Sequence, residues 1–355
     1  MSAKTGKQLA MNTMIGMCVM MFAWNGVGWN TLSLYAGSVV EEFGIMRSQF
    51  MLCITIVSLT NALVNMFLYG TLASKLGMKK LITICGLAAI LAFALFATAR
   101  NIILMWVASL LFGFTISGTS ITTINVVMAR WFRKDPIRYC GYAQTCGSVG
   151  GILASTIWGL MIASVGWRPT FWISCGLSVL ALVLVNLLYK GDPEELKIDL
   201  GENEAAQAAD ELSLEDGPAY SEIFRMPKFY IMALAFFLFG LPDLGLVSNL
   251  AVFTVDLGYD SLSGTVVSVE LIAQALSFLL IGRLVDRFGA KFPILFTQLI
   301  LIVCNLIIIL GLANMGVMYV IAVLAGFADG CAQLSLGAII RGAFGARDFA
   351  KKMGT

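Results

Sequence analysis

The segment Gly282–Lys291 reads Gly-Arg-Leu-Val-Asp-Arg-Phe-Gly-Ala-Lys and joins two long apolar runs. A weaker copy, Gly70–Lys80, reads Gly-Thr-Leu-Ala-Ser-Lys-Leu-Gly-Met-Lys-Lys. Both copies have a glycine, a leucine two residues later, a basic residue, a second glycine seven residues after the first, and a lysine close behind. We interpret both copies as short loops bounded by glycines that permit tight turns. Because each copy lies between the second and third apolar run of its half, the pair indicates a duplicated membrane protein.

The composition is also that of a membrane protein. Of 355 residues, 59% are hydrophobic and 12% are charged, whereas soluble domains carry about 25% charged residues. A membrane-spanning helix needs about 20 apolar residues. The chain has ten such runs, at about 11–36, 48–70, 81–99, 102–128, 140–164, 169–189, 229–255, 262–282, 292–312 and 315–340. Because backbone groups must pair internally in hydrocarbon, we expect an all-α polytopic fold with ten transmembrane helices.

The basic residues predict how the chain is oriented in the membrane. If the N-terminus is cytoplasmic, the cytoplasmic segments hold 20 of the 23 Lys and Arg residues, and the opposite segments hold only Arg47, Arg100 and Arg168. Cytoplasmic segments of membrane proteins carry such an excess. The first apolar run is longer than a signal-peptide core and lacks a clear cleavage site, so we expect a retained helix. We therefore expect a multi-pass protein of the cytoplasmic (inner) membrane with a cytoplasmic N-terminus.

Residues 190–228 differ from the rest of the chain. Between Asp192 and Glu222 there are eleven acidic residues and one lysine. This composition predicts a solvated, partly disordered cytoplasmic linker with a short helix around Glu202–Leu212; a regulatory or docking segment is the alternative. The linker divides the chain into a six-helix half, 1–189, and a four-helix half, 229–355.

The duplicated segment resembles the hallmark loop of the major facilitator superfamily of secondary transporters. Trp-Phe-Arg-Lys at 131–134, the glycine-rich stretch 141–151 and Gly-Trp-Arg at 166–168 are similar to the monocarboxylate transporter and oxalate:formate antiporter branch. Glu-Phe-Gly at 42–44 with Arg-Ser-Gln at 47–49 is similar to bacterial members of the latter. The resemblance implies six plus six helices in inverted three-helix repeats and rocker-switch alternating access. Helices eleven and twelve have no counterpart here, so we expect either a fragment or a shortened protein.

The resemblance further implies that the two segments act as gating loops that latch the halves together. The gating residues would be Gly70, Ser74, Gly77 and Lys79 in the first copy, and Gly282, Asp286, Arg287, Gly289 and Lys291 in the second. Asp286 can face the positive end of a neighbouring helix. Ser74 brings no charge to the same position, so we expect a weaker first latch. The alternative is a pair of tight, positively charged loops without a gating role.

Three acids lie inside apolar runs: Asp243, Glu270 and Asp329. A charge at bilayer depth costs roughly 3 kcal/mol unless it is protonated, paired or hydrated. These runs contain no Lys or Arg. We therefore expect the acids to be protonated part of the time or to face an aqueous cavity, and interpret them as proton-coupling residues. Because Asp243 follows Pro242, we also expect a broken helix there, and a structural role is the alternative for this acid.

Amide and tryptophan side chains within the runs are the candidate substrate-binding residues: Trp24, Asn25, Trp29, Asn30, Asn125, Gln144, Asn249, Gln274 and Gln333. Gln274 and Gln333 lie one helical turn after Glu270 and Asp329. By resemblance, Glu270 and Gln274 stand where branch members have an Asp and a substrate-binding Arg. The site thus keeps an acid and lacks the cation.

These observations predict a secondary active transporter of a small organic solute, by resemblance a mono- or dicarboxylate, with proton symport or anion exchange. The alternatives are a carrier of a neutral or cationic solute, and a non-transporting sensor or assembly subunit. We expect no enzyme, because nucleophile-elbow, phosphate-loop and dinucleotide motifs are missing. We also expect no nucleic-acid partner, no cofactor and a monomer. Without histidine a Cys/His metal site is excluded, and the eight cysteines are interpreted as small apolar fillers.

Overall fold

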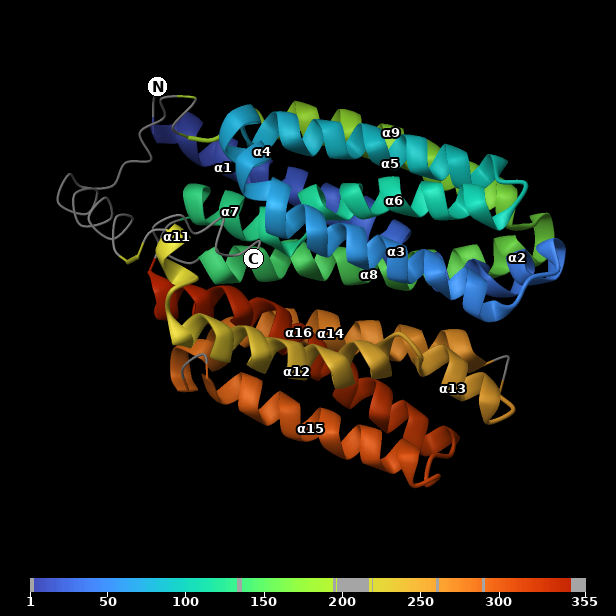
Figure 1. The fold of residues 1–355 in the computed structure, drawn as a ribbon. Coiled ribbons are helices and arrows are strands. Elements are labelled where there is room, and N and C mark those ends of the chain that lie inside the picture. Colours follow the sequence, from blue (N-terminus) through green and yellow to red (C-terminus); the bar gives the residue numbers. More distant parts are fainter. Residues whose placement is uncertain are drawn as a thin grey trace. The chain divides into compact units, whose positions relative to one another are not determined.

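The computed structural model describes residues 3–132, 136–193, 196, 217–218, 220–259, 262–288 and 291–345 (Figure 1). Nearly all of these residues are helical, and no strand occurs among them. Within the described ranges, ten helical segments are long and apolar enough to cross a membrane. The prediction of an all-α polytopic fold with ten spans is therefore confirmed. The described residues fall into two compact units, one within Met1–Gly201 and one within Glu202–Lys352.

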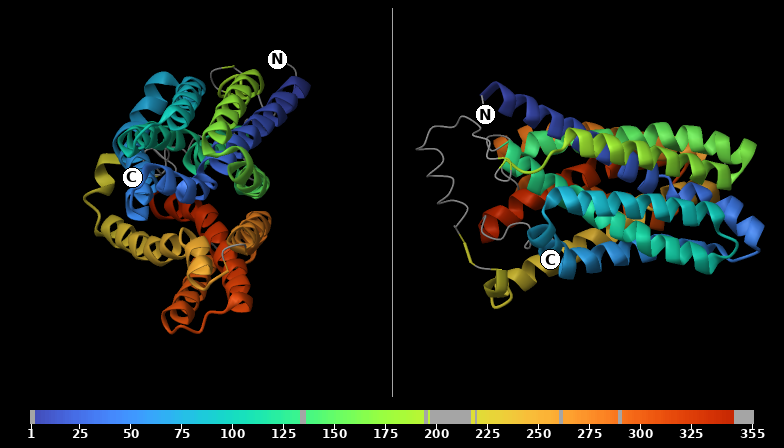
Figure 2. Two further views of the ribbon diagram at one scale, coloured as in Figure 1. Left: turned by 90° about the vertical axis from the view of Figure 1, so that its right-hand side faces the viewer. Right: turned by 90° about the horizontal axis from the view of Figure 1, so that it is seen from above.

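The first unit contains six of the spans. In chain order they are α1 (Ala3–Met20) continuing through η1 (Met21–Trp29), η2 (Leu32–Tyr35) and α2 (Ala36–Phe43); α3 (Arg47–Val64) with η3 (Asn65–Tyr69) and α4 (Gly70–Leu76); α5 (Met78–Thr98); α6 (Ile102–Thr119) with α7 (Ile121–Trp131); α8 (Pro136–Val165); and α9 (Trp167–Leu188). Helix α5 packs alongside α6 and α9 (Figure 2).

The second unit contains the other four spans. They are α12 (Pro227–Val247) with α13 (Leu250–Asp256), preceded by the short α11 (Tyr220–Ile223); α14 (Ser263–Phe288); α15 (Lys291–Ile309); and α16 (Met315–Phe344). The predicted linker helix around Glu202–Leu212 lies in a part of the chain that the structure does not describe.

Local sequence explains where several helices end. The side chain of Asn101 accepts a hydrogen bond from Leu104 N at 2.9 Å and so caps the start of α6. Gly77 (φ +78°) separates α4 from α5, and Gly166 (φ +91°) separates α8 from α9. Glycine adopts these positive φ values without the steric cost that a Cβ would add.

The interpretation of the duplicated segment as loops was wrong for most of its residues. The first copy is helical from Gly70 to Leu76 and turns only at Gly77. In the second copy α14 continues to Phe288, and α15 begins at Lys291. Between the two glycines of each copy stand residues such as Leu, Ala, Lys and Arg, which are good helix formers. In the first copy the turn therefore lies at the second glycine, Gly77.

Several of the described spans are irregular. The segments η1 and η3 are π-helical, and α6 ends where Ser120 adopts an extended backbone (φ −86°, ψ −174°). The expected break at Pro242 is displaced, because α12 continues through this proline to Val247 and the chain turns at Ser248. Neighbouring helices can satisfy the backbone groups that a proline frees in a membrane helix.

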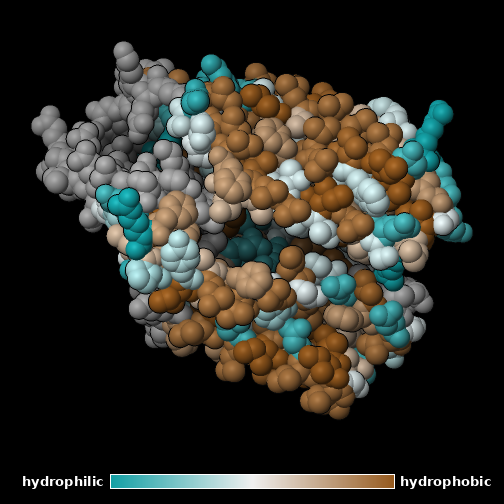
Figure 3. Space-filling view, viewed as in Figure 1, coloured by the Kyte–Doolittle hydropathy of each residue, from teal (hydrophilic) through white to brown (hydrophobic). Residues whose placement is uncertain are grey.

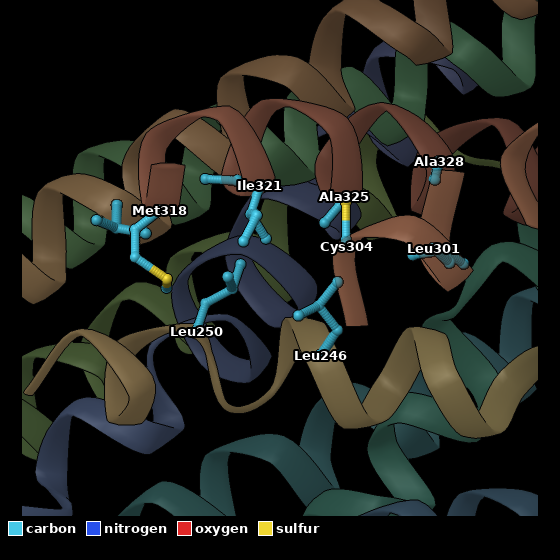
Figure 4. Close-up of a cluster of buried hydrophobic side chains, with 10 residues drawn as sticks. Leu246, Leu250, Leu301, Cys304, Met318, Ile321, Ala325 and Ala328 are labelled. Atoms are coloured by element: carbon cyan, nitrogen blue, oxygen red, sulfur yellow. The ribbon is translucent and has the colours of Figure 1, made fainter. Parts of the chain in front are cut away.

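Each unit has its own apolar core. In the first, the ring of Phe171 stacks on Tyr35 at 3.9 Å and on Phe96 at 5.1 Å between centroids. In the second, Leu246 and Leu250 meet buried side chains of α14, α15 and α16 (Figure 4), namely Val266, Leu301, Cys304, Met318, Ile321, Ala322, Ala325 and Ala328.

The outward faces of the helices are apolar as well. Leu160 is 71% exposed and Ile309 is 77% exposed, and hydrophobic side chains cover most of the helical surface seen in Figure 3. Apolar surface of this extent suits contact with lipid.

Candidate functional site

Three acids from three helices meet inside the second unit. Asp243 lies on α12, Glu270 on α14 and Asp329 on α16. Glu270 is 2% exposed and Asp329 8% exposed, while Asp243 is half-buried. The side chains of Asp243 and Asp329 are within hydrogen-bonding reach of each other, and both act electrostatically on Glu270. We call these three acids, together with Gln274 and Gln333, the acid cluster.

Two amides hold Asp329. Gln274 Nε2 donates to Asp329 Oδ2 across the contact between α14 and α16. Gln333 Nε2, one turn along α16, lies 2.9 Å from both carboxylate oxygens of Asp329. Donated N–H groups stabilise the ionised form of a carboxyl group. These two donors therefore offset part of the cost of burying a negative charge on Asp329.

Each of the other two acids has one carboxyl oxygen that receives no hydrogen bond within the described part of the chain. Glu270 Oε1 and Asp243 Oδ1 are buried and have no hydrogen-bond partner among the described residues. A buried charge without partners is costly, so the neutral carboxyl is the form that these surroundings suit. In addition, two carboxyl groups can share a hydrogen bond only when one of them carries a proton. A cluster with this chemistry can hold a proton as well as a negative charge.

No basic side chain lies in the spanning sequence around the cluster. Residues 229–282 and 292–340 contain neither Lys nor Arg. In low dielectric, uncompensated like charges repel strongly. No side chain of these two segments can therefore compensate a negative charge on the acids with a positive one.

Two glycines of α16 set the spacing of the cluster. A Cβ on Gly326 would lie 2.1 Å from the carbonyl oxygen of Glu270, and one on Gly330 would lie 1.8 Å from Ser277 Oγ. The two glycines are four residues apart and share one helix face. Small residues at this spacing let membrane helices approach closely. This approach brings Asp329 to Gln274. The sequence analysis missed both glycines, although their four-residue spacing indicates a close contact between two membrane helices.

Two asparagines of this unit lie outside the acid cluster. Asn249 is exposed and donates to Gly245 O of the preceding turn at 2.9 Å, so the structure does not bring it to the acid cluster. Asn305, which the sequence analysis missed, donates to Leu301 O at 2.8 Å and to Pro242 O at 3.4 Å. It ties α15 to α12 next to Asp243.

In the first unit, the π-helical segment η1 carries several predicted substrate-binding residues. Its widened turn is closed by Asn30 N–H, which donates to Asn25 O at 3.0 Å. Asn25 Nδ2 donates to Thr119 O at 3.0 Å, where α6 ends. Because π-helical turns are frequent at functional sites, this placement supports a binding role for Asn25, which stays a prediction.

The other predicted residues of the first unit differ in burial. Trp24 is fully buried against α5, where a Cβ on Gly86 would lie 2.8 Å from its ring, so its surroundings favour a packing role. Trp29 is half-buried, and Gln144 on α8 is 3% exposed. Asn125 has a buried Nδ2 without a hydrogen-bond partner in the described part of the chain. Substrate contact remains a prediction for each of these residues.

The structure describes little of the predicted gating residues. Ser74 Oγ donates to Thr71 O at 3.1 Å and so bonds its own helix. Lys79 is half-buried at the start of α5. The side chains of the second copy lie outside the described residues: Gly282, Asp286, Arg287, Gly289 and Lys291. The latch stays a prediction.

Two ion pairs of the first unit were not predicted. Arg130 pairs with the buried Asp192, which also accepts a hydrogen bond from Tyr189 OH at 2.7 Å. Arg168 pairs with Glu42, and both of these side chains are exposed. The first pair ties the residues that follow α9 to the end of α7.

Comparisons with known proteins bear on the whole fold. The sequence profile of the Major Facilitator Superfamily matches residues 13–355. YhjX of Escherichia coli (strain K12), an uncharacterized MFS-type transporter, is 25% identical over 281 residues, which cover 78% of this chain and 66% of YhjX. The quinolone resistance protein NorB of Staphylococcus aureus (strain JH9) is 30% identical over 171 residues, 46% of this chain and 36% of NorB. The chain therefore spans less than two thirds of both relatives.

A solved structure shares the architecture. The crystal structure of the human organic anion transporter MFSD10 (TETRAN) matches with a TM-score of 0.67 at 16% sequence identity, over 98% of this chain and 89% of that one. At this identity the likeness concerns the fold.

Proposed function

The chain belongs to the major facilitator superfamily, and we propose that it is a proton-coupled carrier of a small organic solute. Family membership and the spanning helices make it a multi-pass membrane transporter. One observation supports proton coupling: a cluster of three acids, two buried and one half-buried, without a basic side chain in the surrounding spanning sequence. Intramembrane acids of this kind commonly mark proton or ion pathways.

In this proposal the acids of the cluster have different roles. Asp329, held by two amides, carries the lasting negative charge. Glu270, whose Oε1 has no donor among the described residues, carries the exchangeable proton. If Glu270 loses this proton, a second negative charge forms close to Asp329. Water entering the site or a positive charge on the solute would then have to compensate it. This requirement links proton release to solute occupancy.

The charge balance also favours one class of solute. By resemblance a mono- or dicarboxylate was expected, and MFSD10 is named an organic anion transporter. Carboxylate recognition normally uses Arg or Lys, yet the spanning sequence around the cluster has neither. The acid cluster therefore supports a neutral or cationic solute. A carboxylate that enters together with a proton is the second candidate, supported by the resemblance.

Transport by vesicles that contain the purified full chain tests this proposal. A panel of neutral, cationic and anionic solutes is offered with a pH gradient, and solute accumulation and internal pH are recorded. We expect Glu270→Gln to abolish gradient-driven accumulation but to retain counterflow, because the proton is lost while the site remains. Asp256→Asn, an exposed acid at the end of α13, is the matched control and should behave as wild type.

Two outcomes would contradict the proposal. Accumulation by Glu270→Gln equal to that of wild type would show that Glu270 does not carry the exchangeable proton. Absence of counterflow for every solute would favour a sensor or assembly subunit. A requirement for an anionic solute would instead select the second candidate.

We further propose that the N-terminus is cytoplasmic and that the chain resides in the cytoplasmic (inner) membrane. The distribution of basic residues supports this orientation. An epitope tag before α1 should be protected from protease in intact cells and cleaved in inverted vesicles. Cleavage in intact cells would reverse the assignment.

A further inference from the structure

Two cysteines of the first unit face each other where α1 packs on α8. Cys18 on α1 and Cys146 on α8 are both half-buried, and their side chains are close enough to interact. The backbones beside them are close as well: a Cβ on Gly147 would lie 3.3 Å from Met21 Cε and 3.6 Å from Met21 O. The pairing of the thiols therefore follows from the packing of two helices.

The other cysteines have different surroundings. Cys85 donates to Phe114 O at 3.6 Å, and Cys175 donates to Ile90 O at 3.5 Å. None of the other six interacts with a second thiol among the described residues. The interpretation of cysteines as apolar fillers suits these six. It leaves the paired thiols of Cys18 and Cys146 unexplained.

We propose that Cys18 and Cys146 are a modification site at which hydrogen peroxide forms a reversible disulfide between α1 and α8. The sulfur of one cysteine attacks a peroxide oxygen, the O–O bond breaks, and a sulfenic acid and one water form. The second sulfur then displaces the hydroxyl group, which leaves as a second water, and the S–S bond forms. Two thiols are oxidised by two electrons in total, and one peroxide is reduced to two waters.

The position of the bond gives it a structural consequence. Cys18 lies three residues before Met21, where the π-helical segment η1 begins. A disulfide at this point restrains the beginning of η1 against α8, close to the contacts of Gly147 and Gly150 with Met21 and Phe22. Because peroxide is small and uncharged, it can reach a half-buried thiol inside a helical bundle.

Thiol counting on the purified full chain tests the proposal. After peroxide treatment and alkylation under denaturing conditions, we expect the number of free thiols to fall from eight to six, and a reductant to restore all eight. Mass spectrometry should find one cross-linked pair of peptides that contain Cys18 and Cys146. The Cys18→Ser variant should keep its seven thiols, whereas Cys304→Ser, the matched control, should fall from seven to five.

Other results would overturn the site. Eight thiols remaining in the treated wild type would show that the pair does not oxidise. Loss of a single thiol in the treated wild type would show oxidation without a disulfide between Cys18 and Cys146. Loss of two thiols in Cys18→Ser would show a disulfide between other cysteines. None of these readouts depends on transport, so they stand apart from the proposed function.

Discussion

Replacing Gly326 by alanine should separate α14 from α16 and disrupt the acid cluster. The added Cβ would lie 2.1 Å from the carbonyl oxygen of Glu270 and 3.2 Å from Gln274 N. Both are backbone atoms, which cannot rotate away as a side-chain end can. Ordinary van der Waals contact begins near 3.4 Å, so α16 has to move by about 1.3 Å at this point.

The cost follows from three terms. Overpacking of this kind costs about 1–3 kcal/mol, and loss of the hydrogen bond from Gln274 to the Asp329 carboxylate costs about 1.5–3 kcal/mol. Alanine in place of glycine stabilises the helix by about 0.5–1 kcal/mol, which offsets part of this cost. We therefore expect the second unit to lose roughly 1.5–5.5 kcal/mol of its unfolding free energy. Gly342→Ala on the same helix, with no atom within 4 Å of the new Cβ, should be neutral or slightly stabilising.

The assay has to report on the second unit. All seven tryptophans lie in the first unit, so their fluorescence is unsuitable. Alkylation of the buried thiols of Cys304 and Cys331 during heating, quantified for each site by mass spectrometry, reports on α15 and α16. Gly326→Ala should expose these thiols at a lower temperature than Gly342→Ala and should lose proton-driven accumulation. Equal melting and intact accumulation in the two variants would refute the role assigned to this helix contact.

Two further comparisons test the first unit through its tryptophan fluorescence. Arg130→Gln leaves the Asp192 carboxylate, 3% exposed, without its cation and should cost about 1–3 kcal/mol; Arg168→Gln, in an exposed ion pair, should cost no more than about 1 kcal/mol. Equal losses of unfolding free energy in the two variants would show that burial does not determine what an ion pair contributes to stability. Gly26→Ala places a Cβ 2.4 Å from a carbonyl oxygen of α8 and should cost about 1–3 kcal/mol, whereas Gly159→Ala, with no atom within 4 Å, should be neutral. A stable Gly26→Ala variant would show that η1 and α8 can separate freely.

Hydropathy was sufficient to predict the spans because each span satisfies its backbone locally and needs only length and apolar character. All ten were found, within the described residues, close to their predicted positions. Their internal irregularity was harder to predict. Nothing in the composition of Met21–Trp29 distinguishes a π-helical from an α-helical turn, because the difference depends on which neighbours η1 packs against. Likewise Pro242 predicted a break, and α12 continues through it.

The candidate site could likewise be predicted only in part from the sequence. Helical periodicity places Gln274 on the face of Glu270, one turn away. That argument predicts a neighbour but not a hydrogen-bond partner, and Gln274 donates instead to Asp329 of another helix. Asn249, also chosen for its amide, bonds its own helix. Partners across helices depend on which backbones come close, and here this depends on Gly326 and Gly330 rather than on polar residues.

This arrangement also constrains what the acids can do. Both amide donors of the cluster serve Asp329, while Glu270 Oε1 and Asp243 Oδ1 have no donor among the described residues. A structural ion-binding site would distribute its donors so that every acid is satisfied in one state. A site that exchanges a proton has to leave at least one acid able to change its charge. Under the proposed function, the unequal supply of donors leaves two candidates for the exchangeable proton: Glu270, or the carboxyl pair formed by Asp243 and Asp329. Comparison of Glu270→Gln with Asp243→Asn separates the two. If Asp243→Asn alone abolishes proton-driven accumulation, the proton belongs to the carboxyl pair and Glu270 has the lesser role.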